Sequence, residues 1–182
     1  MSEGERILIT GFMAAGKTTV AAALTQRLDC RMLDLDQFIV EREGRSIAKI
    51  IDEDGEARFR EIEERALFEA LENDAARIIA LGGGTWMSES NRAAIARHNA
   101  LTVWLDAPFE LCWKRITSGE QTRPLARDEE ITQRLYQERR AIYSLAAIHI
   151  RVNAADDSDK IMTEILSALQ RRTTKGRPNR LS

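Results

Sequence analysis

The chain has 182 residues, 43% of them apolar, and its 27 Lys and Arg against 29 Asp and Glu leave a formal net charge of −2. Length and apolar content predict one domain with a sizeable core, and the interspersed charges argue against a disordered polyelectrolyte or a dedicated nucleic-acid binder. No stretch approaches the roughly 20 apolar residues of a membrane helix, and the acidic start shows no signal peptide. The two cysteines, Cys30 and Cys112, lie far apart. We therefore expect a soluble, cytoplasmic protein that binds neither membrane nor nucleic acid.

Five short β-rich runs alternate with helical patterns, at residues 6–10, 31–34, 77–81, 101–105 and 148–152. Apolar residues spaced four apart predict helices over 17–28 and 56–71. Capping oxygens near Asp156 predict the start of a last helix that buries Ile161, Ile165 and Leu169. Strands that alternate with helices predict an α/β fold in which a five-stranded parallel sheet is flanked by helices on both faces.

The C-terminal end, residues 170–182, contains basic residues and no acidic residue. We expect one domain over 1–172 and a disordered basic tail over 173–182. A weak tether for an anionic partner is the alternative reading of this tail.

The strongest motif is GFMAAGKT at residues 11–18, which fits GxxxxGK[ST] between the first expected strand and a helix. Backbone N–H groups that converge at a helix N-terminus bind phosphates. Lys17 adds a charge for the β- and γ-phosphates, and the hydroxyl of Thr18 suits Mg²⁺. Ala14 stands where a positive φ is often needed, which costs a residue with a Cβ about 1 kcal/mol. The motif predicts nucleotide binding; a glycine-containing turn that matches by chance is the alternative.

Two acids, Asp34 and Asp36, end the second run. In an extended chain they lie on the same side, at the carboxyl edge of the sheet where ligands bind. One acid then supports Mg²⁺ directly or through water, and the other orients or deprotonates a substrate hydroxyl. The alternative is a solvated pair that caps the next helix. Because the third run ends without an acid, the metal role falls to Asp34.

A glycine triplet and three arginines complete the candidate site. The triplet 82–84 predicts either close approach to a small polar substrate or a mobile turn. Arg123 lies in a polar loop that reads as a mobile lid, and Arg60 and Arg139 lie on expected helices. Each arginine alone is more often a surface residue, and Arg60 has Glu63 and Glu64 as possible helical partners.

In content and order, these strings resemble the shikimate kinase family of small P-loop kinases. They are the phosphate loop, the acid pair, residues 55–63, the glycine triplet, residues 123–125, and Arg139 with Tyr143. The resemblance covers about residues 7–157 and implies a three-layer P-loop kinase fold. Within it, a substrate-binding region spans about 34–62 and a mobile lid about 113–127. Ala14, Thr18 and Ala126 depart from residues frequent in the family, and none removes a needed chemical group.

The resemblance implies transfer of the γ-phosphoryl group of ATP to the 3-hydroxyl of shikimate, with Mg²⁺ as cofactor, on the route to chorismate and the aromatic amino acids. The products are shikimate 3-phosphate and ADP, and a monomer is expected. The implied catalytic residues are Lys17, Asp36 and Arg123. The implied shikimate-binding residues are Asp36, Arg60, Gly82, Gly83, Gly84 and Arg139. The implied nucleotide-binding residues are Gly11, Ala14, Ala15, Gly16, Lys17, Thr18, Thr19, Arg115, Arg123 and Asn153. Thr18 and Asp34 are the implied metal ligands, Asp34 directly or through water.

Two alternatives stay open at this point. One is a kinase of another small acidic polyol such as gluconate, because two arginines favour an acidic acceptor without specifying its ring. The other is a catalytically silent nucleotide-binding module. A silent module needs no complete catalytic set, and Lys17, Thr18, Asp34, Asp36 and Arg123 are all present.

Overall fold

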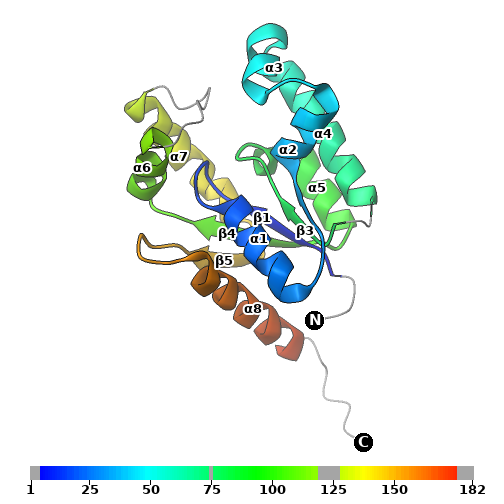
Figure 1. The fold of residues 1–182 in the computed structure, drawn as a ribbon, viewed down its shortest axis with the longest axis vertical. Coiled ribbons are helices and arrows are strands. Elements are labelled where there is room, and N and C mark those ends of the chain that lie inside the picture. The colour runs from blue at the N-terminus through cyan, green and yellow to red at the C-terminus, as the bar shows by residue number, and fades with distance from the viewer. Residues whose placement is uncertain (1–4, 74–75, 119–127, 176–182) are drawn as a thin grey trace, which may run out of the picture.

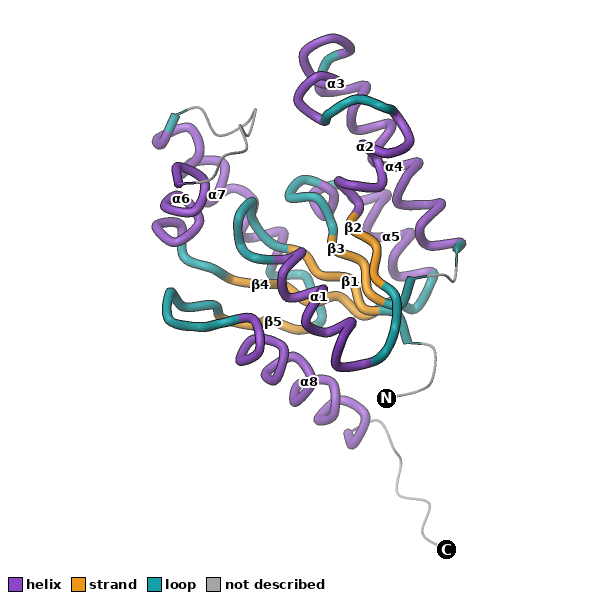
Figure 2. The backbone as a smooth tube through the Cα atoms, viewed as in Figure 1, coloured by secondary structure: helices purple, strands orange, loops and turns teal. Residues whose placement is uncertain are grey.

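The computed structural model describes residues 5–73, 76–118 and 128–175, which form a central parallel sheet with helices around it (Figure 1). The strands are β1 (Ile7–Thr10), β2 (Met32–Asp34), β3 (Ile78–Ala80), β4 (Leu101–Asp106) and β5 (Ile148–Arg151). They pair in the order β2-β3-β1-β4-β5, and every pair is parallel (Figure 2). The predicted fold class and all five predicted strands are confirmed.

The helices are α1 (Lys17–Leu28), α2 (Leu35–Glu43), α3 (Ile47–Asp54), α4 (Glu56–Glu72), α5 (Glu89–Arg97), α6 (Phe109–Ser118), α7 (Glu129–Tyr143) and α8 (Ser158–Lys175), with a short 3₁₀ turn, η1 (Thr85–Met87). Helices α1 and α8 lie side by side against the sheet, α2 packs with α3 and α4, and α6 packs with α7 (Figure 1). The group of α2, α3 and α4 and the pair of α6 and α7 lie on either side of the loops that leave the carboxyl edge of the sheet (Figure 1).

The burial of the strands explains why the sequence predicts them. Strands β1 and β3 are buried along their whole length, because helices cover both faces of the sheet. The edge strand β5 instead alternates, with Ile148 and Ile150 buried and His149 and Arg151 exposed. The sheet therefore forms a rigid platform for the loops at its carboxyl edge.

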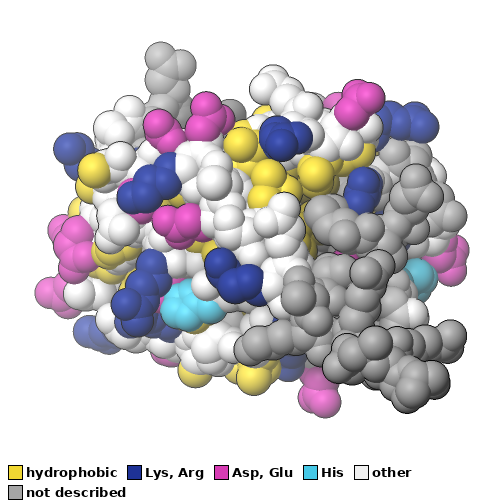
Figure 3. Space-filling view, turned by 90° about the horizontal axis from the view of Figure 1, so that it is seen from below, with side chains coloured by type: hydrophobic (Ala, Val, Ile, Leu, Met, Phe, Trp, Pro, Cys, Tyr) yellow, Lys and Arg dark blue, Asp and Glu magenta, His cyan; other side chains and the backbone are white. Residues whose placement is uncertain are grey.

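Helix α8 buries Ile161, Ile165 and Leu169 against the rest of the molecule, as expected. It continues to Lys175, three residues into the range assigned to the basic tail. Residues 176–182 lie outside the described residues. On the face seen from below in Figure 3, acidic and basic side chains are interspersed.

Among the residues that the structure describes, no helix combines the length and the apolar character needed to cross a membrane.

Candidate active site

The phosphate loop joins the carboxyl end of β1 to the start of α1, as the motif predicts. Gly11 has φ 146°, and a Cβ there would stand 2.7 Å from the carbonyl oxygen of Leu105, so the close approach of β4 requires glycine. Gly16, in the left-handed region at φ 98°, is the N-cap of α1. The Nζ of Lys17 donates to the carbonyl oxygens of Gly11 (3.1 Å) and Phe12 (3.0 Å). The loop thus presents an ammonium group and the N-terminal end of α1 to the same space, which suits phosphate.

Ala14 adopts the left-handed conformation, with φ 59°. We expect Ala14→Gly to raise the free energy of unfolding by up to about 1 kcal/mol, because glycine adopts this conformation without the Cβ clash. Ala15 is the matched control, because it is buried and does not have a positive φ. Ala15→Gly should lower the free energy of unfolding, since glycine gains conformational entropy in the unfolded chain and nothing is relieved in the folded one. Thermal unfolding of the two variants measures both effects. A lower melting temperature for Ala14→Gly would contradict this account of the loop.

Asp34 links the phosphate loop to the second strand. Its Oδ2 accepts a hydrogen bond from the hydroxyl of Thr18 at 2.5 Å, at the start of α1. Its Oδ1 accepts the backbone N–H groups of Asp36 (3.0 Å) and Gln37 (3.2 Å), so Asp34 is the N-cap of α2. A hydroxyl and a carboxylate side by side are hard oxygen donors, and they fit a magnesium ion bound together with phosphate.

The prediction that Asp34 and Asp36 share one side of an extended chain is wrong. Helix α2 begins at Leu35, because the Asp34 carboxylate caps the turn that follows it. Asp34 therefore caps α2 with one carboxylate oxygen and contacts Thr18 with the other, while Asp36 lies in the first turn of α2 with its carboxylate next to Gly82.

Asp36 lies against the glycine triplet. A Cβ on Gly82 would stand 2.6 Å from Oδ1 of Asp36, 2.9 Å from Oε1 of Glu63 and 3.0 Å from Oγ1 of Thr85. Three polar side chains from different elements therefore converge on this backbone position. The absence of a side chain at Gly82 lets these three protein side chains approach the backbone closely, and a side chain at 82 would displace Asp36.

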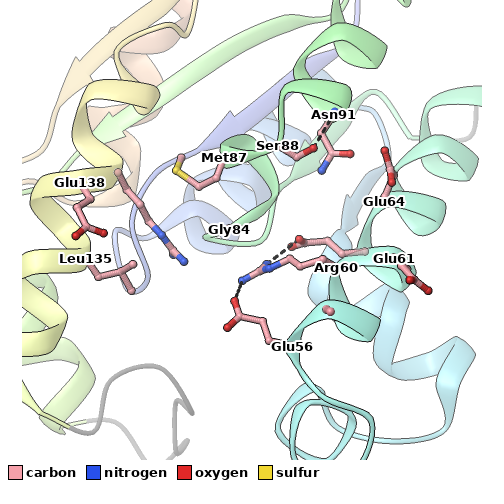
Figure 4. Close-up of a pocket in the computed structure, with 13 residues that line it drawn as sticks. Glu56, Arg60, Glu61, Glu64, Gly84, Met87, Ser88, Asn91, Leu135 and Glu138 are labelled. Carbon is pink, nitrogen blue, oxygen red and sulfur yellow. Dashed lines mark hydrogen bonds and ion pairs between the residues drawn. The ribbon is translucent and has the colours of Figure 1, made fainter.

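A pocket of about 490 Å³ opens between α4, η1 and α7, and Arg60 points into it (Figure 4). The Nη1 of Arg60 pairs with Glu63 at 2.8 Å, and its Nη2 pairs with Glu56 at 2.9 Å. Burial alone lowers the pKa of Arg60, but the two glutamates outweigh burial and raise it, so the guanidinium stays charged. Glu64, the other helical partner considered from the sequence, accepts a hydrogen bond from Ser90 instead.

Arg139 lines the same pocket from α7 and is 9% exposed. Its Nη1 donates to the carbonyl oxygen of Gly83 at 3.3 Å, and the hydroxyl of Tyr143 donates to the same oxygen. Burial raises the pKa of Tyr143, so its phenol stays protonated as a donor. The structure therefore brings Arg60 and Arg139 together around the glycine triplet.

Of the remaining predicted nucleotide-binding residues, Arg115 contacts the phosphate loop. On α6, Arg115 donates from Nη1 to the carbonyl oxygen of Ala14 at 3.1 Å. Asn153, after β5, donates from its backbone N and from Nδ2 to Asp156 at 2.7 and 3.0 Å. Thr19 is exposed in the first turn of α1. Arg123 and residues 119–127 of the expected lid lie outside the described residues.

Sequence reasoning missed the buried polar groups behind the pocket, chiefly Glu63 and Thr85. Glu63 is 2% exposed, and Thr85 is completely buried. From helical spacing alone, Glu63 is expected only as an ion-pair partner of Arg60 on the helix surface. A signal was present, because Glu63 falls within the stripe of Phe59, Ile62 and Ala66, where a carboxylate is unexpected without a bonding partner.

A phosphate loop beside a pocket in which Arg60 and Arg139 stand among five glutamates is an arrangement suited to moving a phosphoryl group from a nucleotide to a second small molecule. The fold and this site define the class of the protein, an ATP-dependent P-loop kinase of small molecules. Residues 13–170 match the family model described as Shikimate kinase. The chain belongs to the shikimate kinase family.

Individual relatives agree with this family over almost their whole length. The chain is 35% identical to the shikimate kinase of Sulfurihydrogenibium sp. over 92% of this chain and 99% of the relative. It is similar to the crystal structure of shikimate kinase from Aquifex aeolicus, with 32% identity, a TM-score of 0.79 and coverage of 94% of this chain and 99% of that one. It is also similar to shikimate kinase from Acinetobacter baumannii in complex with shikimate, with 29% identity, a TM-score of 0.83 and coverage of 96% of both chains.

Proposed function

We propose that this chain transfers the γ-phosphoryl group of ATP to the 3-hydroxyl of shikimate, giving shikimate 3-phosphate and ADP. The observation that carries the proposal is the convergence of Arg60, Arg139 and Asp36 on the glycine triplet, next to a complete phosphate loop. The acceptor in this proposal carries a carboxylate and a hydroxyl group, and the hydroxyl oxygen has to lie next to the γ-phosphorus of ATP.

The two arginines bind the acceptor carboxylate in this proposal. A planar guanidinium presents its N–H donors in a fork that matches a carboxylate, and two such groups fix both its position and its plane. Glu63 pairs with Nη1 of Arg60 and Glu56 pairs with Nη2, and these two contacts hold the orientation of the guanidinium. Arg139 is held in turn by the Gly83 carbonyl.

Asp36 orients the reacting hydroxyl and accepts its proton late in the reaction. Phosphoryl transfer passes through a loose transition state, so catalysis rests mainly on positioning and on charge stabilisation. Lys17 and the backbone N–H groups of the phosphate loop stabilise the charge on the transferred group. The family resemblance adds Arg123 to this role, and Arg123 lies outside the described residues.

Thr18 and Asp34 are the residues that would hold Mg²⁺, Asp34 directly or through water. When bound, the ion neutralises charge on the β- and γ-phosphate oxygens. A monomeric, cytoplasmic enzyme with one domain over 1–172 is part of the proposal. It is supported by Cys30 and Cys112, which are not joined in a disulfide. Among the described residues, the exposed large apolar side chains are Ile131 and Leu145, too few to form an extended apolar patch.

An acceptor panel tests the proposed function. The purified protein is given ATP, MgCl₂ and, in separate reactions, shikimate, gluconate and neutral polyols, and ADP release is followed. We expect turnover that requires both shikimate and Mg²⁺ and stops when EDTA is added. Faster turnover with gluconate, or ATP binding without turnover across the panel, would overturn the proposal in favour of one of the two alternatives.

A further inference from the structure

A line of buried polar contacts leads from α5 to Arg60. The Nδ2 of Asn91 donates to the carbonyl oxygen of Thr85 at 2.9 Å. The hydroxyl of Thr85 donates to Oε1 of Glu63 at 2.7 Å, and Oε2 of Glu63 pairs with Nη1 of Arg60 at 2.8 Å. The four residues come from three elements: Asn91 from α5, Thr85 from η1, and Glu63 and Arg60 from α4. Only the last group, Arg60, is substantially accessible, at 30% exposure of its side chain.

The Thr85 hydroxyl matters because the carboxylate to which it donates, that of Glu63, is buried. A carboxylate removed from water is stable only when both of its oxygens are satisfied by charge or hydrogen bonds. Glu63 divides its oxygens between a cation on one side and a hydroxyl on the other. A hydroxyl beside an ionised carboxylate acts as the donor, so Thr85 fixes which oxygen of Glu63 faces Arg60.

Space around this contact is limited. Oγ1 of Thr85, Oε1 of Glu63 and Oδ1 of Asp36 all lie within 3.0 Å of the point where a Cβ would stand on Gly82. A test of the hydroxyl must therefore preserve the volume of the side chain. Valine is the natural replacement, because it exchanges the hydroxyl for a methyl group of similar size.

We propose that Thr85 is a positioning residue of the acceptor site, which acts through Glu63 to hold Arg60 in the orientation that binds the acceptor carboxylate. This inference rests on the proposed function. Asn91 supports it by anchoring the backbone of Thr85 to α5. The hydrogen bonds of Thr85 join it to Glu63, Asn91 and Gly82, away from Lys17 and Thr18, so we expect ATP binding to be independent of the hydroxyl.

The experiment compares Thr85→Val with the wild type by steady-state kinetics and by calorimetric titration with shikimate. We expect KM and Kd for shikimate to rise about tenfold, since a buried acceptor loses its donor, while KM for ATP stays unchanged. Thr85→Ser should restore the wild-type values. The matched control is Thr102→Val on β4, where another buried threonine hydroxyl, bonded to the N–H of Ala147 at 3.0 Å, is removed without contact to Arg60.

A double-mutant cycle separates positioning from general loosening of the fold. If Thr85 acts through Arg60, Thr85→Val should raise KM for shikimate less than about twofold in the background of Arg60→Lys. An undiminished effect in that background overturns the inference, as does an unchanged KM for shikimate or an equal rise in KM for ATP. Should the valine variant fail to fold, Thr85→Ala removes the hydroxyl together with the methyl group; comparison with Thr85→Ser, which lacks only the methyl group, then isolates the effect of the hydroxyl on KM for shikimate. A wild type that neither binds nor phosphorylates shikimate contradicts the proposed function instead, so the two failures are distinguishable.

Discussion

Replacing Asp36 with Asn is expected to lower kcat for shikimate about 100- to 10,000-fold, the range for loss of a positioned proton acceptor. The substitution keeps the shape of the side chain next to Gly82 but removes the charge that orients and deprotonates the hydroxyl. Because Asp36 lies in the first turn of α2 and Asp34 caps that helix, the fold should be retained. ADP release with saturating ATP and shikimate measures the effect.

The control for this substitution is Asp52→Asn, which alters an exposed carboxylate on the neighbouring helix α3. Its turnover should match the wild type. If Asp36→Asn also turns over at the wild-type rate, Asp36 is not the acceptor of the proton, and the mechanism proposed here loses its base.

The second large effect is expected for Lys17→Ala, which should reduce kcat/KM about 1,000-fold. The ammonium group donates to the carbonyl oxygens of Gly11 and Phe12 in the phosphate loop, and the proposed mechanism assigns it the stabilisation of charge on the transferred phosphoryl group. Alanine favours the helix, so the substitution should keep α1 while it removes the ammonium group and its two hydrogen bonds. Steady-state kinetics with ATP as the varied substrate measure the loss.

Lys49→Ala is the matched control for Lys17→Ala, because it also removes a lysine. Lys49 lies on the exposed surface of α3, and its Nζ is 3.7 Å from a carboxylate oxygen of Glu53. We expect no change in kcat/KM for that variant. Activity of Lys17→Ala within about tenfold of the wild type would mean that the loop binds phosphate through its backbone alone.

Strands β1, β3 and β4 were predictable because they are buried along their whole length. Strands covered on both faces appear in the sequence as continuous apolar runs, and the glycine and acid residues that follow them mark the carboxyl edge. The phosphate loop was predictable for a related reason, since close approach to β4 dictates Gly11 and the start of α1 dictates the residues that follow.

Local geometry at the site was harder to predict. Two acids at i and i+2 look alike whether the chain is extended or turns into a helix, and only the contact of Asp34 with Thr18 and with the α2 backbone separates their roles. The buried contact of Glu63 with Thr85 joins α4 to η1 across 22 positions in the chain, a distance over which helical spacing carries no information. The residues behind a site are thus less visible in a sequence than those that line it.

A structure of the chain with shikimate and a non-hydrolysable ATP analogue bound together with Mg²⁺ tests the central claim most directly. The account predicts that the Asp36 carboxylate accepts a hydrogen bond from the 3-hydroxyl of shikimate, that this oxygen faces the terminal phosphorus, and that Arg60 and Arg139 both contact the acceptor carboxylate. A complex in which another group holds the 3-hydroxyl, or in which the acceptor carboxylate lies away from both arginines, would contradict it.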